Sequence, residues 1–406
     1  EGRLKSLAGG DSPADCVVVA EGRIADLISG LPALPPCDAA PDALAAILYT
    51  SGSTGKPKGV MLSHANLWLG AVSVAEYLKL TPDDRVLAVL PLSFDYGQNQ
   101  LLSTWAAGGC VVPLEYLTAR DVIKAVARDR ITTLAGVPPL WVQLTEADWP
   151  EDAARTLRRL TNSGGALTRT LIAKMSALFT QADIYPMYGL TEAFRSTCLP
   201  SELVASHPES MGRAIPHAEI LVCRADGSVT DADEPGELVH CGPLVAQGYW
   251  RDAQRTAQRF RPAPPSSRYG GVAVWSGDTV RRDPEGLLYF VGRDDAMIKS
   301  AGNRISPTEI EEAAAAIAGI AEAVALGISD ERLGQAVCLL VRPISGGDDA
   351  ALKDQVLIEL KQQLPNFMVP RDVMIVADFP CNANGKIDRV ALVQTHSQLA
   401  KKEQHA

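Results

Sequence analysis

The chain has 406 residues, of which 47% are hydrophobic and 21% are charged, and its formal net charge is −10 at pH 7. This composition is typical of a folded globular protein and excludes a disordered, collagen-like or coiled-coil chain. The length predicts two or three domains, because one hydrophobic core rarely grows beyond about 250–300 residues. The negative charge argues against a nucleic-acid-binding surface, and no apolar run reaches the roughly 18–20 residues that a membrane span needs.

The cysteines and histidines exclude further classes of protein. Eight scattered cysteines without a C-x-x-C pair indicate reduced thiols in a cytoplasmic protein, not a disulfide framework or a zinc cluster. Six histidines without ligand spacing argue against a metal hydrolase. The chain opens on Glu1 instead of methionine and has no signal peptide, so we expect a fragment of a longer protein.

Helix and strand patterns alternate along the first half of the chain. An apolar run at 44–49 predicts a strand that leads into a glycine-rich loop at 50–59. The alternation continues with helices predicted at 71–80, 119–130 and 167–179 and with strands predicted at 85–92, 108–114 and 131–138. This order predicts α/β layers around a largely parallel sheet.

Two different patterns follow in the second half. Short strands with Asp-Gly and Glu-Gly turns between residues 211 and 292 predict antiparallel β structure. Beyond residue 293, helices are predicted at 307–320 and 352–365, and strands at 335–343 and 372–380. This last stretch of about 110 residues is long enough for a hydrophobic core of its own, so we expect a separate small α+β domain.

The glycine-rich loop carries the first chemical signal. Its glycines let the backbone approach a ligand closely, and its hydroxyl and ammonium groups suit phosphate oxygens. The loop differs from a Walker A sequence, because Lys56 is followed by Pro57 instead of a hydroxyl residue. A flexible surface loop is the plain alternative. The candidate phosphate ligands are Thr50, Ser51, Gly52, Ser53, Thr54, Gly55 and Lys58.

Four shorter motifs lie further along the chain, and each of them alone is more typical of an ordinary turn or a solvated charge. Backbone glycines can lie against a flat ring, a carboxylate suits Mg²⁺ or the two hydroxyls of a ribose, and arginine or lysine suits a phosphate. The motifs are Asn162-Ser163-Gly164-Gly165-Ala166, Tyr188-Gly189-Leu190-Thr191-Glu192, Ser276-Gly277-Asp278 with Gly292-Arg293, and Asn384-Gly385-Lys386.

In this order, the five motifs resemble those of the adenylate-forming superfamily, which comprises acyl-CoA synthetases, luciferases and the adenylation domains of peptide synthetases. The resemblance extends over residues 50–389. It implies an α/β fold with a large N-terminal domain of layered sheets and a β-rich part, followed by a small mobile α+β domain. We therefore expect an adenylation domain at 1–293, without its first hundred or so residues, and a C-terminal lid at 294–406 with a hinge at Asp294-Asp295.

The resemblance also implies an AMP-forming acid–thiol ligase. Such enzymes join a carboxylic acid to ATP as an acyl-adenylate, release pyrophosphate, and pass the acyl group to CoA or to the phosphopantetheine of a carrier protein, here acting in trans. The expected cofactors are therefore ATP, Mg²⁺ and one of these two thiols. Matched by motif, Tyr188, Gly189 and residues 164–166 are expected at adenine, Thr191 at the α-phosphate, Glu192 at Mg²⁺, and Asp278 and Arg293 at the ribose.

Lys386 matches the catalytic lysine of this superfamily, which bridges the acid and the phosphate. Two anions meet during the attack, and a mobile ammonium group offsets their repulsion. In the family, the small domain rotates about the hinge between the two half-reactions. This rotation would bring the region of Lys299, Ala301 and Gly302 to the site for thiol transfer.

The identity of the acid has two interpretations. Phe94, Asp95 and Tyr96 form the expected substrate pocket and resemble a peptide-synthetase stretch in which the aspartate pairs with the ammonium group of an amino acid. The stretches at 297–302 and 305–311 are more similar to acyl-CoA synthetases, which act on plain carboxylic acids. In that case Asp95 is a structural carboxylate.

Two other classes of function remain to be weighed. A non-catalytic nucleotide-binding homologue is disfavoured, because Lys386, Glu192 and Asp278 are all present. A luciferase-like oxidoreductase would share the adenylation step, but nothing in the sequence requires oxygen chemistry. We therefore expect a small carboxylic acid as the main partner, with no nucleic acid and no membrane span.

Overall fold

The computed structural model describes residues 29–30, 38–50, 57–293, 297–300, 303–330, 332–344 and 349–403. Several predicted features lie outside these residues: Ser51, Gly52, Ser53, Thr54 and Gly55 of the glycine-rich loop, the hinge at Asp294-Asp295, and Ala301-Gly302. The domain boundary predicted at the hinge stays a prediction.

A β-hairpin holds the base of the glycine-rich loop. Its strands β1 (Leu44–Thr50) and β2 (Lys58–Ser63) pair antiparallel, with Thr50 directly opposite Lys58. Helix α3 (His64–Tyr77) follows and begins at His64 instead of residue 71. The reason is a capping box, because the Ser63 hydroxyl accepts from the Asn66 amide at 3.1 Å and Asn66 Oδ1 accepts from the Ser63 amide at 3.0 Å.

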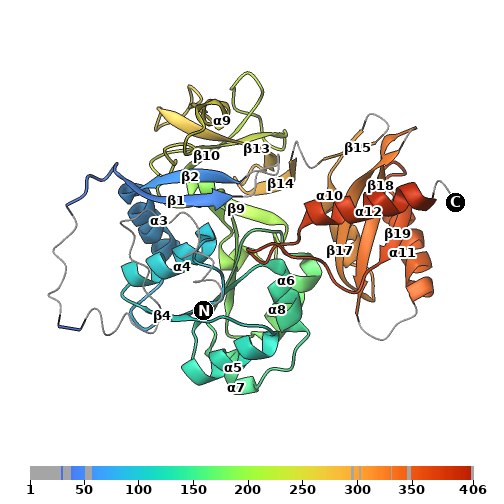
Figure 1. The fold of residues 1–406 in the computed structure, drawn as a ribbon, viewed down its shortest axis with the longest axis horizontal. Coiled ribbons are helices and arrows are strands. Elements are labelled where there is room, and N and C mark those ends of the chain that lie inside the picture. Colours follow the sequence, from blue (N-terminus) through green and yellow to red (C-terminus); the bar gives the residue numbers. More distant parts are fainter. Residues whose placement is uncertain are drawn as a thin grey trace, which may run out of the picture. The chain divides into compact units, whose positions relative to one another are not determined.

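The large sheet is parallel in its first half, as the alternating pattern predicted. The strand order β4-β3-β5-β6-β7 is all parallel, with a helix or helices connecting each strand to the next in sequence. Helices α3 and α4 lie side by side (Figure 1). The strands are β3 (Arg85–Ala88), β4 (Cys110–Pro113), β5 (Thr133–Gly136), β6 (Arg159–Asn162) and β7 (Asp183–Tyr188), and the helices are α4 (Asp95–Ala106), α5 (Ala119–Asp129), α6 (Pro138–Thr145), α7 (Glu151–Thr156) and α8 (Arg169–Leu178).

The same sheet continues into an antiparallel half, also as predicted. After β7 the order runs β8-β9-β14-β13-β11-β10, and β12 pairs with β13. The strands are β8 (Thr197–Cys198), β9 (Ser210–Ala214), β10 (Glu219–Cys223), β11 (Gly236–Cys241), β12 (Phe260–Pro262), β13 (Val272–Arg282) and β14 (Leu288–Arg293). Three short helices complete this part: η2 (Thr191–Ala193), η3 (Ser201–Leu203) and α9 (Ala253–Arg259).

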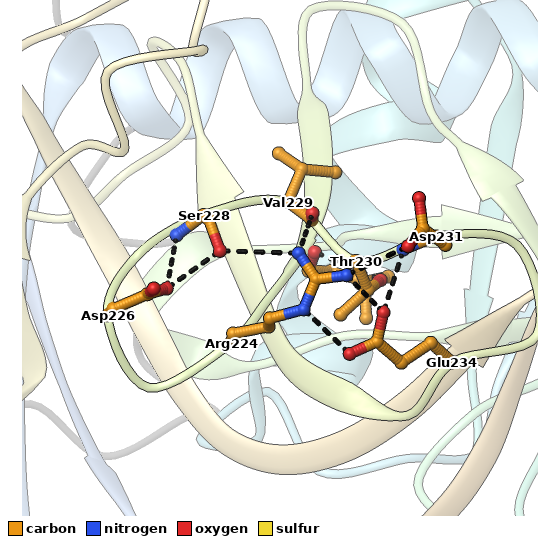
Figure 2. Close-up of polar contacts among 8 residues, drawn as sticks. Arg224, Asp226, Ser228, Val229, Thr230, Asp231 and Glu234 are labelled. Atoms are coloured by element: carbon orange, nitrogen blue, oxygen red, sulfur yellow. Dashed lines mark hydrogen bonds and ion pairs between the residues drawn. The ribbon is translucent and has the colours of Figure 1, made fainter.

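One arginine organises the connection between β10 and β11 (Figure 2). The Arg224 guanidinium donates to Glu234 Oε1 at 2.7 Å and to the Val229 carbonyl at 2.7 Å, and it lies 3.1 Å from Asp231 Oδ2. Asp226 Oδ1 accepts from the Ser228 amide at 2.9 Å within the predicted Asp-Gly turn. These contacts close the connection on itself and leave the neighbouring strands free to pair.

The C-terminal part has its own sheet and its own core, as predicted. Strand order is β16-β15-β18-β17, with β19 parallel to β18, and helices α10, α11 and α12 pack around it (Figure 1). The predicted helix at 307–320 ends at Ala315, because the chain turns and enters β17 at Ile320. The elements are β15 (Ile298–Ser300), β16 (Asn303–Ile305), α10 (Pro307–Ala315), β17 (Ile320–Asp330), β18 (Gly334–Pro343), α11 (Asp349–Gln363), β19 (Asp372–Ile375) and α12 (Arg389–Glu403).

His240 on β11 makes the fold sensitive to acid. It is fully buried, its Nδ1 lies 3.0 Å from Ser196 Oγ, and burial lowers its pKa from 6.5 to about 3. The unfolded chain therefore binds more protons between these two values, and stability is lost as the pH falls below 6.5. At about pH 5 we expect this residue to lower the free energy of unfolding by about 2 kcal/mol relative to neutral pH.

Urea unfolding at about pH 7 and pH 5 checks this prediction. A His240→Gln variant is expected to show a shallower pH dependence than the parent protein, whatever its absolute stability. His207→Gln serves as the control, because His207 is only half-buried and contacts the neighbouring Ser206. An unchanged slope in His240→Gln contradicts the prediction.

Candidate active site

The predicted site residues gather at one edge of the parallel half of the sheet. Phe94 and Asp95 follow β3, the loop at 164–166 follows β6, and Tyr188 ends β7. The carboxyl ends of parallel strands meet at the same edge, which is where α/β proteins bind ligands. A cavity of about 830 Å³ opens there, and its lining includes Gly164, Gly165, Ala166, Tyr188, Gly189, Asp278, Arg293 and Lys386.

Tyr188, Asp278 and Arg293 form one connected group. The Tyr188 hydroxyl donates to Asp278 Oδ2, and Arg293 Nε lies 2.9 Å from Asp278 Oδ1. The pairing of β13 with β14 explains the ion pair, because Asp278 and Arg293 are directly opposite each other. Burial raises the pKa of Tyr188 well above its ordinary value, and the Asp278 carboxylate raises it further. Tyr188 therefore stays a neutral phenol that holds the carboxylate in place.

Lys386 reaches this cavity from the C-terminal part of the chain. A Cβ atom at Gly164 would overlap Lys386 Cε, and Lys386 Nζ lies 4.6 Å from the centre of the Phe94 ring. Burial lowers the pKa of Lys386, whereas the Asp95 carboxylate raises it. The glycine at position 164 thus leaves the space that the lysine side chain occupies.

A tight turn presents Lys386. Asn382 Oδ1 accepts from the backbone amides of Asn384 at 2.9 Å and Lys386 at 3.2 Å. Gly385 has φ of +74°, a left-handed conformation that glycine adopts without strain. This explains locally why an Asn-Gly-Lys sequence stands at this position.

Several contacts hold the C-terminal part against the parallel half of the sheet. Arg342 on β18 contacts two glutamates. Its Nη2 lies 3.3 Å from Oε1 of Glu146, which directly follows α6, and its Nε lies 2.7 Å from Oε2 of Glu322 on β17. The Thr170 hydroxyl on α8 donates to the carbonyl of Ala315 at 3.2 Å. These contacts join the part of the chain that carries Lys386 to the part that carries the parallel sheet.

Glu192 and Lys58 meet through a residue that sequence reasoning missed. The Tyr249 hydroxyl donates to Glu192 Oε1 at 2.6 Å, and Lys58 Nζ lies 5.4 Å from the centre of the Tyr249 ring. Burial lowers the pKa of Lys58, and the Glu192 carboxylate opposes this effect. An isolated bridge between Val60 and Tyr249 joins the segments. Thr50 and Lys58, opposite each other at the hairpin end, thus lie near Glu192.

The predicted substrate residues are buried at the start of α4, where Phe94 is the N-cap and Asp95 and Tyr96 form the first turn. Tyr96 Oη lies 2.6 Å from Thr161 Oγ1, and the Arg195 guanidinium lies 4.7 Å from the centre of the Tyr96 ring. Arg195 was also missed by sequence reasoning, since a lone arginine after a motif is usually a solvated charge. Lys299 is different: it is exposed on β15, and its amide donates to Gln335 Oε1 at 2.7 Å. It does not line the cavity described above.

Family models match both parts of the chain. The model described as AMP-binding enzyme matches residues 5–250, and the model described as AMP-binding enzyme C-terminal domain matches residues 309–386. The chain belongs to the AMP-binding enzyme family. The adenylate-forming resemblance and the fold with a large N-terminal and a small C-terminal domain are thereby confirmed.

Similar proteins include both acyl-CoA ligases and peptide synthetases. Tyrocidine synthase 3 of Brevibacillus parabrevis is 31% identical over 367 residues, which cover 88% of this chain and 6% of that protein. Indoleacetate–CoA ligase of Aromatoleum aromaticum is 31% identical over 347 residues, with 84% of this chain and 65% of that protein covered. The chain therefore spans less than two thirds of either relative.

Solved structures of the family agree with this fold. ATP-bound MatB from Rhodopseudomonas palustris superimposes with a TM-score of 0.80 at 29% identity, covering 90% of this chain and 71% of that one. A benzoate CoA ligase from Burkholderia xenovorans gives a TM-score of 0.79 at 27% identity, covering 89% and 71%. In the described part of the chain, no helix is long and apolar enough to cross a membrane.

The residues of this AMP-binding enzyme fit a bound Mg²⁺ that is shared with a nucleotide. The described residues hold no cluster of three or more metal-ligating side chains, so a cage made by the protein alone is absent there. Mg²⁺ beside phosphates usually takes one or two carboxylates and completes its shell with phosphate and water oxygens. Glu192 is a buried carboxylate that Tyr249 orients, and it would hold the ion in this way.

Glu312 makes the contact between the two parts of this AMP-binding enzyme sensitive to pH. Its pKa is raised to about 7, mainly by burial and also by the nearby Glu209 carboxylate, while Arg169 acts in the opposite direction. The folded protein keeps the Glu312 proton at pH values where the unfolded chain has lost it, so this contribution to stability is lost as the pH rises from 4.5 to about 7.

We expect Glu312→Gln to remove this dependence. As the pH rises from about 5 to about 8, the free energy of unfolding of the variant should increase by about 1 kcal/mol relative to that of the parent protein. This value is reduced because the group is partly exposed. Urea unfolding at both pH values measures the difference. Glu151→Gln, an exposed glutamate of α7, is the control. A constant difference between Glu312→Gln and the parent across this range would overturn the prediction.

Proposed function

We propose that this protein activates a carboxylic acid with ATP, forms an acyl-adenylate with release of pyrophosphate, and transfers the acyl group to a thiol. The observation that carries the proposal is the position of Lys386, which enters from the C-terminal part and lies over Gly164 and beside Phe94. The family match and the shared cavity support it.

In this proposal the nucleotide lies between two groups of contacting residues, Tyr188–Asp278–Arg293 and Lys58–Tyr249–Glu192. Tyr188 and the backbone at 164–166 face adenine, and Asp278 with Arg293 binds the ribose hydroxyls. Thr50, Lys58 and the loop residues 51–55 bind the outer phosphates, and Thr191 binds the α-phosphate. Two sets of contacts support this placement. The adenosine end is supported by Tyr188–Asp278–Arg293, and the phosphate end is supported by Lys58–Tyr249–Glu192.

Lys386 supplies the charge that the first step needs. The attacking carboxylate and the triphosphate repel each other, and an ammonium group next to both stabilises the transition state. Mg²⁺ held by Glu192 would neutralise the charge that develops on pyrophosphate. Asp95 acts on Lys386 by favouring its protonated form against the effect of burial. Lys386 is therefore the catalytic residue of the adenylation step.

The second step transfers the acyl group to CoA or to a carrier-protein phosphopantetheine. Lys299 lies on the C-terminal part, away from the cavity that contains Lys386. We propose that rotation of a lid at 294–406 about Asp294-Asp295 exchanges the Lys386 turn for the Lys299 region, as alternating arrangements of one domain serve two half-reactions.

An amino acid is the second candidate substrate, favoured by one observation. Asp95 is a carboxylate of which only 8% is exposed, and it acts on the ammonium group of Lys386. A carboxylate in that position can also receive the ammonium group of an amino acid.

ATP–pyrophosphate exchange with the full chain tests the proposed function. The panel contains amino acids and short, medium and aryl carboxylic acids. Exchange that depends on one acid supports acid activation, and exchange with amino acids alone assigns Asp95 to the substrate ammonium. A protein that binds ATP but exchanges pyrophosphate with none of these acids contradicts the proposal. Product assays with CoA and with a phosphopantetheinylated carrier protein then identify the thiol.

A further inference from the structure

A strained turn places one arginine beside the site. Phe194 has φ of 63° and ψ of −70°, and the Arg195 amide donates to the Ala193 carbonyl at 2.7 Å. These values describe a γ-turn with positive φ, which is rare and strained, above all for an aromatic residue. The Phe194 ring packs directly against Gly70, where a Cβ atom would overlap it. This contact anchors the turn. Such strain persists where the surrounding structure imposes it, and it concentrates at functional sites.

The turn directs Arg195 into the interior. Only 2% of Arg195 is exposed, and its Nη1 donates to Ser163 Oγ at 2.8 Å. Within the described residues, its Nε has no hydrogen-bond partner, and no carboxylate forms an ion pair with it. The Tyr96 ring stacks on the guanidinium but offers no acceptor in its plane. The Tyr77 hydroxyl also contacts the guanidinium, but no described carboxylate pairs with it, so a bound anion would stabilise this buried charge.

Arg195 lies next to the reacting end of the proposed substrate site. Ser163, its acceptor, immediately precedes Gly164, over which Lys386 lies. A Cβ at Gly189 would come within 3.1 Å of Arg195 Cδ, so the arginine packs directly behind Gly189 of the cavity wall. Arg195 also acts electrostatically on Lys386. Both cations therefore act on the same region of the proposed substrate site.

The helix that faces this region is polar on its buried side. α4 buries Asp95, Tyr96, Asn99, Gln100, Ser103 and Thr104. Asn99 lies one turn beyond Tyr96 on the same face, and among the described residues its Nδ2 has no hydrogen-bond partner. The N–H donors without a partner on Asn99 and Arg195 suit an acceptor group better than an alkyl chain.

We infer that Arg195 binds a second carboxylate of the substrate, so that the acid activated by this protein is a short dicarboxylic acid. This inference rests on the proposed function and names its substrate class. Lys386 binds the carboxylate that reacts, which loses its own charge when it becomes the mixed anhydride. The second carboxylate keeps its charge through both half-reactions and remains the counter-ion of Arg195. Bidentate pairing with a carboxylate is the geometry that a guanidinium prefers.

The test compares short dicarboxylic acids with monocarboxylic acids of equal carbon number in ATP–pyrophosphate exchange. The parent protein is expected to favour one dicarboxylic acid by at least about a hundredfold in kcat/KM, because a site built for a polar group rejects the analogue that lacks it. In Arg195→Met this preference should fall to within about tenfold, while the KM for ATP stays unchanged. Arg195→Lys keeps the positive charge but loses the paired N–H donors of the guanidinium, so it should retain part of the preference for the dicarboxylic acid.

Controls separate this inference from the proposed function. Arg120→Met removes an exposed arginine of α5 and should leave the preference intact. Binding of the favoured dicarboxylic acid, measured by calorimetry without turnover, should weaken in Arg195→Met, and circular dichroism verifies its fold.

Exchange with monocarboxylic acids or neutral amino acids alone would overturn the inference and leave the proposed function standing. No exchange with any acid would overturn both. An equal preference in Arg195→Met and the parent also overturns the inference. A preference for aspartate or glutamate, which are themselves dicarboxylic acids, supports it if Arg195→Met loses that preference.

Discussion

Lys386→Ala is expected to lower ATP–pyrophosphate exchange by at least about a hundred- to thousandfold, while ATP still binds with nearly unchanged affinity. Removing one preorganised charge-stabilising group from an active site costs about this much in rate. ATP binding is retained because the residues proposed for adenine and ribose, Tyr188, Asp278 and Arg293, come from the other part of the chain and contact one another without the lysine.

Exchange kinetics and ATP calorimetry on the same preparation measure the two quantities separately. Lys353→Ala, an exposed lysine on α11 of the same C-terminal part, is the matched control and should behave as the parent protein. Lys386→Arg keeps a positive charge but not the compact ammonium group, and we expect it to recover only part of the rate. Exchange at the parent rate in Lys386→Ala would remove Lys386 from the mechanism.

Asp278→Ala is expected to weaken ATP binding by about a hundredfold, or about 3 kcal/mol. Asp278 is only 4% exposed, accepts from Tyr188 and pairs with Arg293, so its loss removes a ribose ligand and leaves two neighbours without their shared partner. The effect should appear in the affinity for ATP, because the proposed contact exists before the reaction as well as during it.

Calorimetry with ATP in the absence of any acid checks this prediction. Asp152→Ala on α7 is the control, since that carboxylate is exposed and remote from the cavity. Asp278→Asn keeps the shape and one acceptor and should lose less affinity than Asp278→Ala. Circular dichroism must show that both variants fold. Parent affinity in a folded Asp278→Ala variant would contradict the ribose role.

Local patterns predicted much of the architecture. The helix predicted at 119–130 and the strand at 335–343 appear as α5 and β18 within one residue at either end, because their apolar spacing is regular and their ends carry turn residues. The start of α3 and the end of α10 were misplaced. Both boundaries depend on a cap or on the next strand, and neither is visible in the spacing of apolar residues.

The family and the residue types of the site follow from the sequence alone, because five short motifs in a given order specify a chemistry even when each is weak alone. Which of these residues meet depends on the folded structure. Tyr249 orients Glu192 from 57 positions away, and Lys386 lies over Gly164 from a turn in the C-terminal part of the chain. The burial of Arg195 likewise depends on α4, the Ser163 loop and a strained turn together. Burial and charge pairing arise from segments distant in the chain, and for that reason no local pattern encodes them.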